Sequence, residues 1–99
     1  MIQIEYVWIF NGSKGRFPGG VFTELAKAEE WIATNRLTGI LTQYPVNVGC
    51  LDWAIENNLT SMSQEKLAQK RTEPDFIGSF STASQEHYHY EQGVKQQLE

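Results

Sequence analysis

The first ten residues show an alternating pattern of apolar positions. Every second residue is apolar, namely Ile2, Ile4, Tyr6, Trp8 and Phe10, and a period of two is typical of a β-strand. The positions between them begin polar but become apolar at Val7 and Ile9. We therefore predict an interior strand whose second half is covered on both faces.

The next segment predicts a turn and a second strand, which together form a β-hairpin. Residues 11–15 (NGSKG) predict a turn, in which Asn11, Gly12 and Gly15 can supply positive φ angles. In RFPGGVF at 16–22 the apolar residues suit a strand, but Pro18 and the two glycines after it interrupt the pattern. Proline lacks a donor for the ladder and glycine pairs often mark a bulge, so we expect an irregular edge strand.

Helical spacing follows in residues 24–36. Leu25, Ala28 and Ile32 recur every three or four residues, and Thr23 stands before them as the expected N-cap. This stripe predicts an amphipathic helix that packs on the sheet.

The remaining segments predict shorter elements. Residues 39–45 (GILTQYP) indicate a third strand that ends at the proline. The spacing of Leu51, Ile55 and Leu59 indicates a short helix that ends near Asn57 and Asn58. Residues 60–75 are polar and predict a surface excursion with one loose helical turn. A compact helix is expected to begin at Pro74. Residues 82–92 fit either a helix or an extended segment.

These elements predict an α+β fold with the order ββαβα. The sheet is expected to have three mainly antiparallel strands, the first of them central, packed on one main helix, with one or two further short C-terminal helices. Residues 1–95 are expected to form a single domain in which 60–75 is the polar surface excursion. Residues 96–99 are expected to be a disordered tail, and Leu98 and Glu99 to be a vector remnant.

Composition and charge narrow the class of protein. The chain has 99 residues and one cysteine, which excludes an intramolecular disulfide framework and a multi-cysteine metal site. It has no apolar run of roughly 18 residues and no basic region before its first apolar residues, so we expect no membrane span, no signal peptide and a cytoplasmic location. Residues 1–50 carry four basic and four acidic side chains, whereas residues 51–99 carry four basic and eight acidic. This acidic balance disfavours nucleic acid as a partner.

Two histidines in the segment EHYHYE suggest metal chemistry. If the segment is extended, His87, His89 and Glu91 share one face and could ligate a divalent transition metal. A helix would instead separate the histidines. Metal binding, or metal-dependent catalysis, is therefore one alternative, and a packing segment with half-exposed histidines is the other. We predict no other cofactor.

No pattern of residues predicts a catalytic site, so we expect a protein that is not an enzyme. Cys50 precedes an apolar helix, where a lone cysteine is more often a small buried hydrophobe than a nucleophile. A nucleic-acid or nucleotide contact through Lys14, Arg16 and Phe17 is a weaker alternative, because cations beside an aromatic ring can touch a phosphate and a base. Solvated loop charges are the commoner case.

Aromatic residues make up 12% of the chain, a content that favours an aromatic core but also suggests a binding surface. Tryptophan and tyrosine prefer sites with one wet end, so some should line a groove for a protein partner or a small ligand. The predicted binding residues are Trp8, Tyr44, Trp53, Arg16 and Phe17. The competing interpretation is an aromatic core. We predict a small non-enzymatic protein-interaction or regulatory module, for which a homodimer is compatible with an uncovered apolar patch.

Six short motifs place the chain beside a known group of proteins. They are VWIFNG (7–12), RFPGGVF (16–22), AEEWI (28–32), LTGILTQYP (37–45), DWA (52–54) and SQEHYHYEQG (84–93). With these motifs the chain resembles a family of small, uncharacterised bacterial proteins classed as a domain of unknown function. The resemblance implies that the fold runs past His89 and includes the EHYHYE segment, and it implies no catalytic residue.

Overall fold

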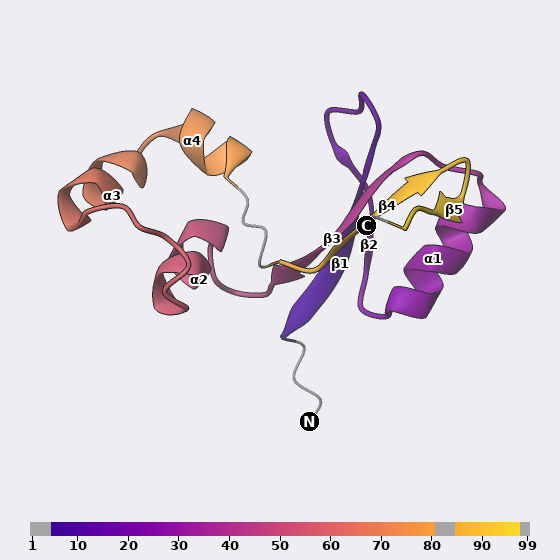
Figure 1. Ribbon diagram of the computed structural model, residues 1–99, viewed down its shortest axis with the longest axis horizontal. Coiled ribbons are helices and arrows are strands. Elements are labelled where there is room, and N and C mark those ends of the chain that lie inside the picture. Colours follow the sequence, from indigo (N-terminus) through magenta and orange to yellow (C-terminus); the bar gives the residue numbers. More distant parts are fainter. Residues whose placement is uncertain (1–4, 81–84, 98–99) are drawn as a thin grey trace. The chain divides into compact units, whose positions relative to one another are not determined.

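The computed structural model describes residues 5–80 and 85–97 (Figure 1). The chain divides into two compact units, of which unit 1 comprises Met1–Val46 with Glu86–Glu99, and unit 2 comprises Asn47–Gln85. The single domain at residues 1–95 stays a prediction, and residues 98 and 99 of the expected tail lie outside the described residues.

Unit 1 is built on an antiparallel sheet. Its strands are β1 (Tyr6–Gly12), β2 (Pro18–Phe22), β3 (Gly39–Pro45), β4 (His87–Glu91) and β5 (Val94–Lys95). They lie side by side in the order β2-β1-β3-β4-β5. β1 and β3 pair along their whole length, from Tyr6 opposite Pro45 to Gly12 opposite Gly39. β1 is therefore interior, as its pattern predicts, but β3 rather than β1 is central.

The sheet has five strands, so the prediction of three was wrong. Of the two further strands, β4 lies in the segment 82–92 that fitted either a helix or an extended conformation, and β5 follows directly after it. Gln92 and Gly93 both have positive φ angles, 50° and 83°, and reverse the chain between β4 and β5. Such a turn is usually signalled by Asn-Gly or Asp-Gly, and Gln-Gly gave no comparable signal.

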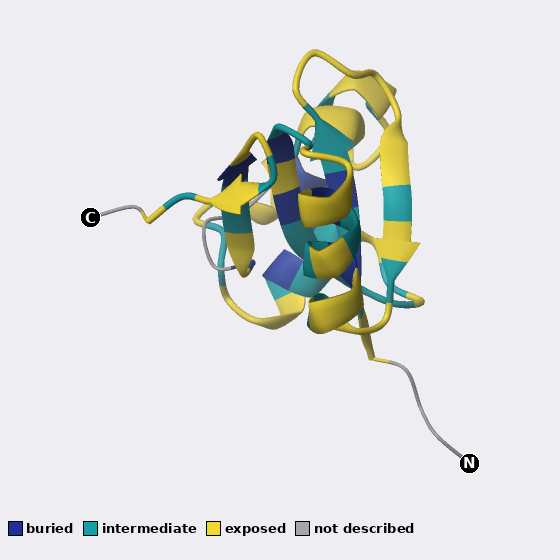
Figure 2. Ribbon diagram, turned by 90° about the vertical axis from the view of Figure 1, so that its right-hand side faces the viewer, coloured by how far each residue is buried: buried dark blue, intermediate teal, exposed yellow. Residues whose placement is uncertain are grey.

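The β1–β2 hairpin carries the irregularity that its sequence predicts. Phe10 lies opposite Gly20 and Asn11 opposite Pro18, so Gly19 is an extra residue on β2. This bulge interrupts the ladder beside the proline, which has no N–H to donate. β2 lies at the edge of the sheet and is exposed or half-buried throughout (Figure 2).

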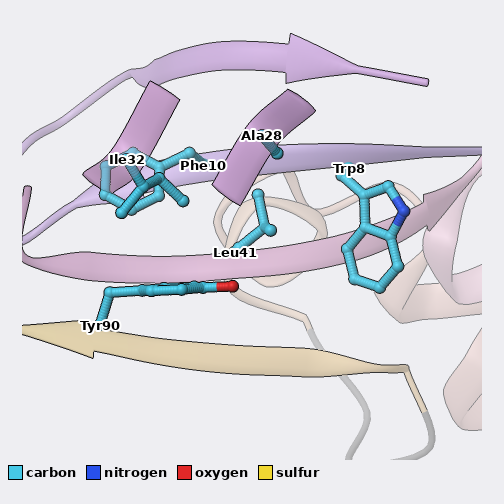
Figure 3. Close-up of a cluster of buried hydrophobic side chains, with 6 residues drawn as sticks. All are labelled: Trp8, Phe10, Ala28, Ile32, Leu41 and Tyr90. Atoms are coloured by element: carbon cyan, nitrogen blue, oxygen red, sulfur yellow. The ribbon is translucent and has the colours of Figure 1, made fainter. Parts of the chain in front are cut away.

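One helix, α1 (Leu25–Thr34), packs on one face of this sheet and closes the core of unit 1. The buried cluster consists of Trp8, Phe10, Leu41 and Tyr90 from the sheet and Ala28 and Ile32 from α1 (Figure 3). The helical spacing therefore predicted the buried stripe correctly. The expected N-cap was wrong, because Glu24 rather than Thr23 holds the extended N-cap conformation, and it makes no side-chain capping bond.

Ring contacts account for much of the aromatic content of unit 1. The ring centroids of Phe10 and Trp31 lie 5.5 Å apart with an edge-to-face angle of 82°. Those of Trp8 and Tyr88 lie 5.7 Å apart and are stacked at 26°. Both geometries are favourable for aromatic pairs. Unit 1 therefore has an aromatic core, as the alternative to the binding-surface interpretation predicts.

Unit 2 contains three short helices, α2 (Cys50–Glu56), α3 (Gln64–Lys70) and α4 (Pro74–Ser79). Leu51 and Ala54 of α2 and Leu67 of α3 are buried. Helices after Gly49 and at Pro74 were predicted, but the described residues hold four helices in all, and three of them lie between β3 and β4 rather than at the C-terminal end. No helix in the described part of the chain is both long and apolar enough to cross a membrane.

The chain leaves and re-enters unit 1 at neighbouring points of the sheet. Thr42 of β3 lies opposite His87 of β4, and just beyond this pair the N–H of Gln43 donates to the carbonyl oxygen of Glu86 at 2.9 Å. Unit 2 is therefore inserted where a short hairpin turn would otherwise join two paired strands.

Candidate binding surface on the sheet

The two faces of the sheet are covered differently within unit 1. Side chains alternate between the faces of a strand, so Trp8, Leu41 and Tyr90, which pack with α1, share one face. We call the opposite side the open face. Its side chains, read from the register, are Val7, Ile9, Asn11, Val21, Ile40, Thr42, Tyr44, His87, His89, Glu91 and Val94. No described helix of unit 1 lies over it.

Apolar side chains occupy much of the open face. Val21 of β2 is 62% exposed and lies opposite the half-buried Ile9 of β1. Ile40 of β3 is 39% exposed and Val94 of β5 is 63% exposed. Single exposed apolar residues are ordinary on a protein surface, but these residues lie on one face of one sheet. The open face therefore combines accessibility with apolar character.

A pocket of about 590 Å³ lies at one end of the open face. Its central row crosses three strands, with Asn11 opposite Ile40 and Ile40 opposite His89. Gln96 continues the row, because its N–H donates to the carbonyl oxygen of His89 at 2.7 Å. The other lining residues are Gly12, Ser13, Lys14, Thr38, Gly39, Tyr90, Glu91 and Gln97.

Close approach of β1 and β3 shapes this end of the sheet. A Cβ atom on Gly39 would lie 2.6 Å from Cζ of Phe10 and would collide with the carbonyl oxygen of Asn11. Beyond the strands, the N–H of Ser13 donates to the carbonyl oxygen of Thr38 at 2.9 Å. Lys14 follows with a φ of 67°, in the left-handed region. The glycine and the turn thus set the rim of the pocket.

Two opposite charges line the pocket without neutralising each other. Lys14, from the turn after β1, and Glu91, at the end of β4, are both exposed. The ion pairs among the described residues involve neither of them. The pocket therefore offers one cation and one anion to a ligand.

A separate polar cluster joins α1 to β4 and β5 on the helix-covered side. The Tyr90 hydroxyl donates to Oε2 of Glu29 at 2.6 Å, and Nζ of Lys95 lies 2.8 Å from the same oxygen. Lys95 Nζ also lies 4.0 Å from the centroid of the Tyr88 ring. This cluster, which we call the Glu29 clamp, fixes the C-terminal hairpin to the helix.

The clamp shifts the pKa values of both acidic groups. Burial acts to raise the pKa of Glu29, but hydrogen bonds from Lys95 and Tyr90 and the charge of Lys95 outweigh it and hold that pKa below its usual value. Burial, the hydrogen bond to Glu29 and the charge of Glu29 raise the pKa of Tyr90 far above its usual range. At neutral pH the clamp is therefore a charged carboxylate held by a neutral phenol and an ammonium group.

The family of the chain is shown by a match that covers nearly its whole length. Residues 7–96 match the family described as Domain of unknown function (DUF7710). The chain belongs to the DUF7710 family. The matched residues include all of β2 to β5, all of β1 except Tyr6, and all of unit 2, so the resemblance to a family of unknown function is confirmed. No curated protein and no solved structure matches the chain.

The histidines of the DUF7710 domain lie as the extended alternative predicts. β4 places His87 and His89 on the open face, with ring centroids 5.5 Å apart. Within the described ranges, however, no group of three or more His, Cys, Asp or Glu residues is arranged to hold a metal ion. The strand therefore aligns His87, His89 and Glu91 without assembling them into the predicted tridentate site.

The predicted binding residues have different environments in the DUF7710 domain. Trp8 is only 7% exposed and lies in the core. Tyr44 is half-buried on the open face, and Trp53 is half-buried on α2 in unit 2. Arg16 and Phe17 lie in the β1–β2 loop, with the guanidinium carbon 5.7 Å from the centroid of a ring that is 73% exposed. Their role in binding stays a prediction.

The sequence singled out Lys14, His89 and Glu91 for other roles, but it did not indicate that they and the other lining residues form one pocket. Asn11, Ile40 and Thr38 come from separate segments, and only the pairing of β1, β3 and β4 brings them together. One usable signal was the alternation in residues 39–45, which separates buried Leu41 from exposed Ile40. This alternation indicates that the solvent-facing side of the strand also carries an apolar residue.

Cys50 does not have the environment of a nucleophile. It is half-buried at the start of α2, and burial, opposed only in part by a backbone hydrogen bond, raises the pKa of its thiol. A raised pKa lowers the fraction of reactive thiolate at neutral pH. The structure therefore favours the interpretation of Cys50 as a small buried hydrophobic residue over its interpretation as a nucleophile.

Proposed function

We propose that the DUF7710 domain is a small non-enzymatic protein-interaction module whose partner docks on the open face. The observation that carries this proposal is the pair of exposed apolar residues Val21 and Ile40 on a sheet face that α1 does not cover. Apolar patches that stay accessible on a folded domain often mark protein–protein contact sites. An apolar surface on the partner is the chemistry that this face fits.

The pattern of β1 supports the same proposal. An antiparallel strand with one solvated face normally alternates apolar and polar residues. In β1 the core residues Trp8 and Phe10 alternate with Val7 and Ile9, which lie on the open face. The strand thus has the composition of one that is covered on both sides, and a docked partner would supply the second cover.

The size of the open face sets the strength of the expected complex. With strands about 4.8 Å apart and a rise of about 3.4 Å per residue, a face of five strands and seven residues spans at most roughly 450 Å². A stable interface usually takes about 800 Å² from each partner. We therefore expect a transient complex, which is best detected by covalent trapping.

Site-specific photocrosslinking in cells tests this proposal. A photoreactive amino acid is placed at Val21 on the open face or, as the control, at Ala26, which is exposed on α1. We expect a discrete protein adduct from position 21 that is absent from position 26, and an adduct of two chains would identify the partner as a second copy. Equal adducts from both positions, or none from position 21, would refute the proposal.

A further inference from the structure

The pocket on the open face receives its charged groups from two sides. Lys14 follows β1 and Glu91 ends β4, and these strands flank β3. Because neighbouring strands lie about 4.8 Å apart, the backbones that carry the two charges are separated by roughly 10 Å. A ligand that lies across β3 would meet a cation at one end and an anion at the other.

The space between the charges combines neutral hydrogen-bonding groups with one apolar contact. Ile40 lies in the central row of the pocket, between Asn11 and His89. The Thr38 hydroxyl oxygen accepts a hydrogen bond from the N–H of Gln92 at 3.0 Å, so the hydroxyl hydrogen is still available to a ligand. Amides, hydroxyls and an imidazole are groups that can pair with a peptide bond.

We propose that this pocket binds a short zwitterionic peptide, with its carboxylate at Lys14 and its ammonium group at Glu91. A simple anion would face Glu91 and a simple cation would face Lys14, whereas a zwitterion pairs with both. A peptide of two extended residues spans roughly 7 Å. This length is shorter than the distance between the two backbones, so it suits charges on the side chains of Lys14 and Glu91 that reach inward from them. The volume of about 590 Å³ lies within the range of small-ligand sites, roughly 300–1,000 Å³.

This assignment goes beyond the proposed function and does not depend on it. Ile40 belongs to both surfaces, but a docked protein also needs the apolar residues of β2 and β1, whereas the peptide needs the polar groups at the end formed by β1, β3 and β4. Val21 does not line the pocket. Crosslinking at position 21 therefore reports on the partner and not on the peptide.

Calorimetric titration with dialanine tests the peptide site. Three forms are compared on the full chain, one with both termini free, one N-acetylated and one C-amidated. We expect saturable binding of the form with both termini free. Blocking either end should lower the affinity about fivefold, because a partly exposed ion pair contributes a free energy of this size. Raising the salt concentration should reduce this difference, because salt screens both pairs.

Variants assign each end of the peptide to its residue. Lys14→Gln should remove the difference between the free and C-amidated forms, and Glu91→Gln should remove the difference between the free and N-acetylated forms. Lys66→Gln and Glu65→Gln, which remove the same charges from exposed positions of α3, serve as matched controls and should leave both differences intact.

Three results would overturn the peptide site. They are an absence of saturation up to about 10 mM dialanine, equal affinity for the free and blocked forms, and variants at Lys14 and Glu91 that behave like the controls. The comparison of blocked forms uses the unaltered chain, so it decides the matter even where a variant fails to fold.

Discussion

At the scale of single residues, Gly39 shows how one missing Cβ atom allows two strands to meet. We predict that Gly39→Ala lowers the free energy of unfolding by about 2–3 kcal/mol, because the added methyl group overpacks against Phe10 and Asn11. Urea unfolding measures this change. Gly78→Ala is the matched control, since nothing lies within 4 Å of a Cβ at that exposed position. An equal cost at both glycines would contradict this account.

The Glu29 clamp predicts a dependence of stability on pH. Because folding lowers the pKa of Glu29, its carboxylate stabilises the fold above the unfolded pKa, and this stabilisation is lost as the pH falls through the folded pKa. We expect Glu29→Gln to cost about 1 kcal/mol at pH 7, after allowance for partial exposure. The difference from the unaltered chain should shrink in acid.

Urea unfolding at neutral and acid pH measures the effect of the clamp. Glu30→Gln, which changes an exposed neighbour on α1, is the control and should alter stability little at either pH. A cost of Glu29→Gln that stays constant as the pH falls would show that the Glu29 carboxylate acts through packing rather than through its charge.

At the scale of elements, local patterns predicted those parts that depend on local sequence. Alternation revealed β1, helical spacing revealed α1, and Pro45 marked the end of β3. The pairing of β3 with β4 joins residues on either side of unit 2, and no local pattern contains that information. The pocket depends on this pairing, which is why its residues could not be predicted together.

The C-terminal hairpin is predicted to be essential to the fold of unit 1. A chain that ends at Gln85 would lack β4 and β5, and with them Tyr88 and Tyr90, which cover Trp8 and Leu41 in the core. We expect such a chain to lose cooperative unfolding, as followed by near-ultraviolet circular dichroism. A chain that ends at Gln97 is the control and should unfold like the full sequence. Cooperative unfolding of the shorter chain would contradict the five-stranded core.

At the scale of the whole molecule, the arrangement of the chain predicts that unit 1 folds without unit 2. β3 and β4 lie next to each other where unit 2 is inserted, and Gln43 bonds to Glu86 across the junction. We therefore expect a short turn in place of residues 47–85 to leave unit 1 folded. Dispersed amide signals in an NMR spectrum would confirm this, and a collapsed spectrum would show that the core of unit 1 requires unit 2.

The role of the open face as a docking surface is tested most directly by measuring the affinity for the partner that crosslinking identifies. We expect Val21→Lys to weaken binding at least about tenfold, because it places a charge within the apolar contact. Ala26→Lys adds the same charge on α1 and should leave the affinity unchanged. If Val21→Lys binds as tightly as the unaltered chain, or if Ala26→Lys weakens binding equally, the open face is not the docking surface.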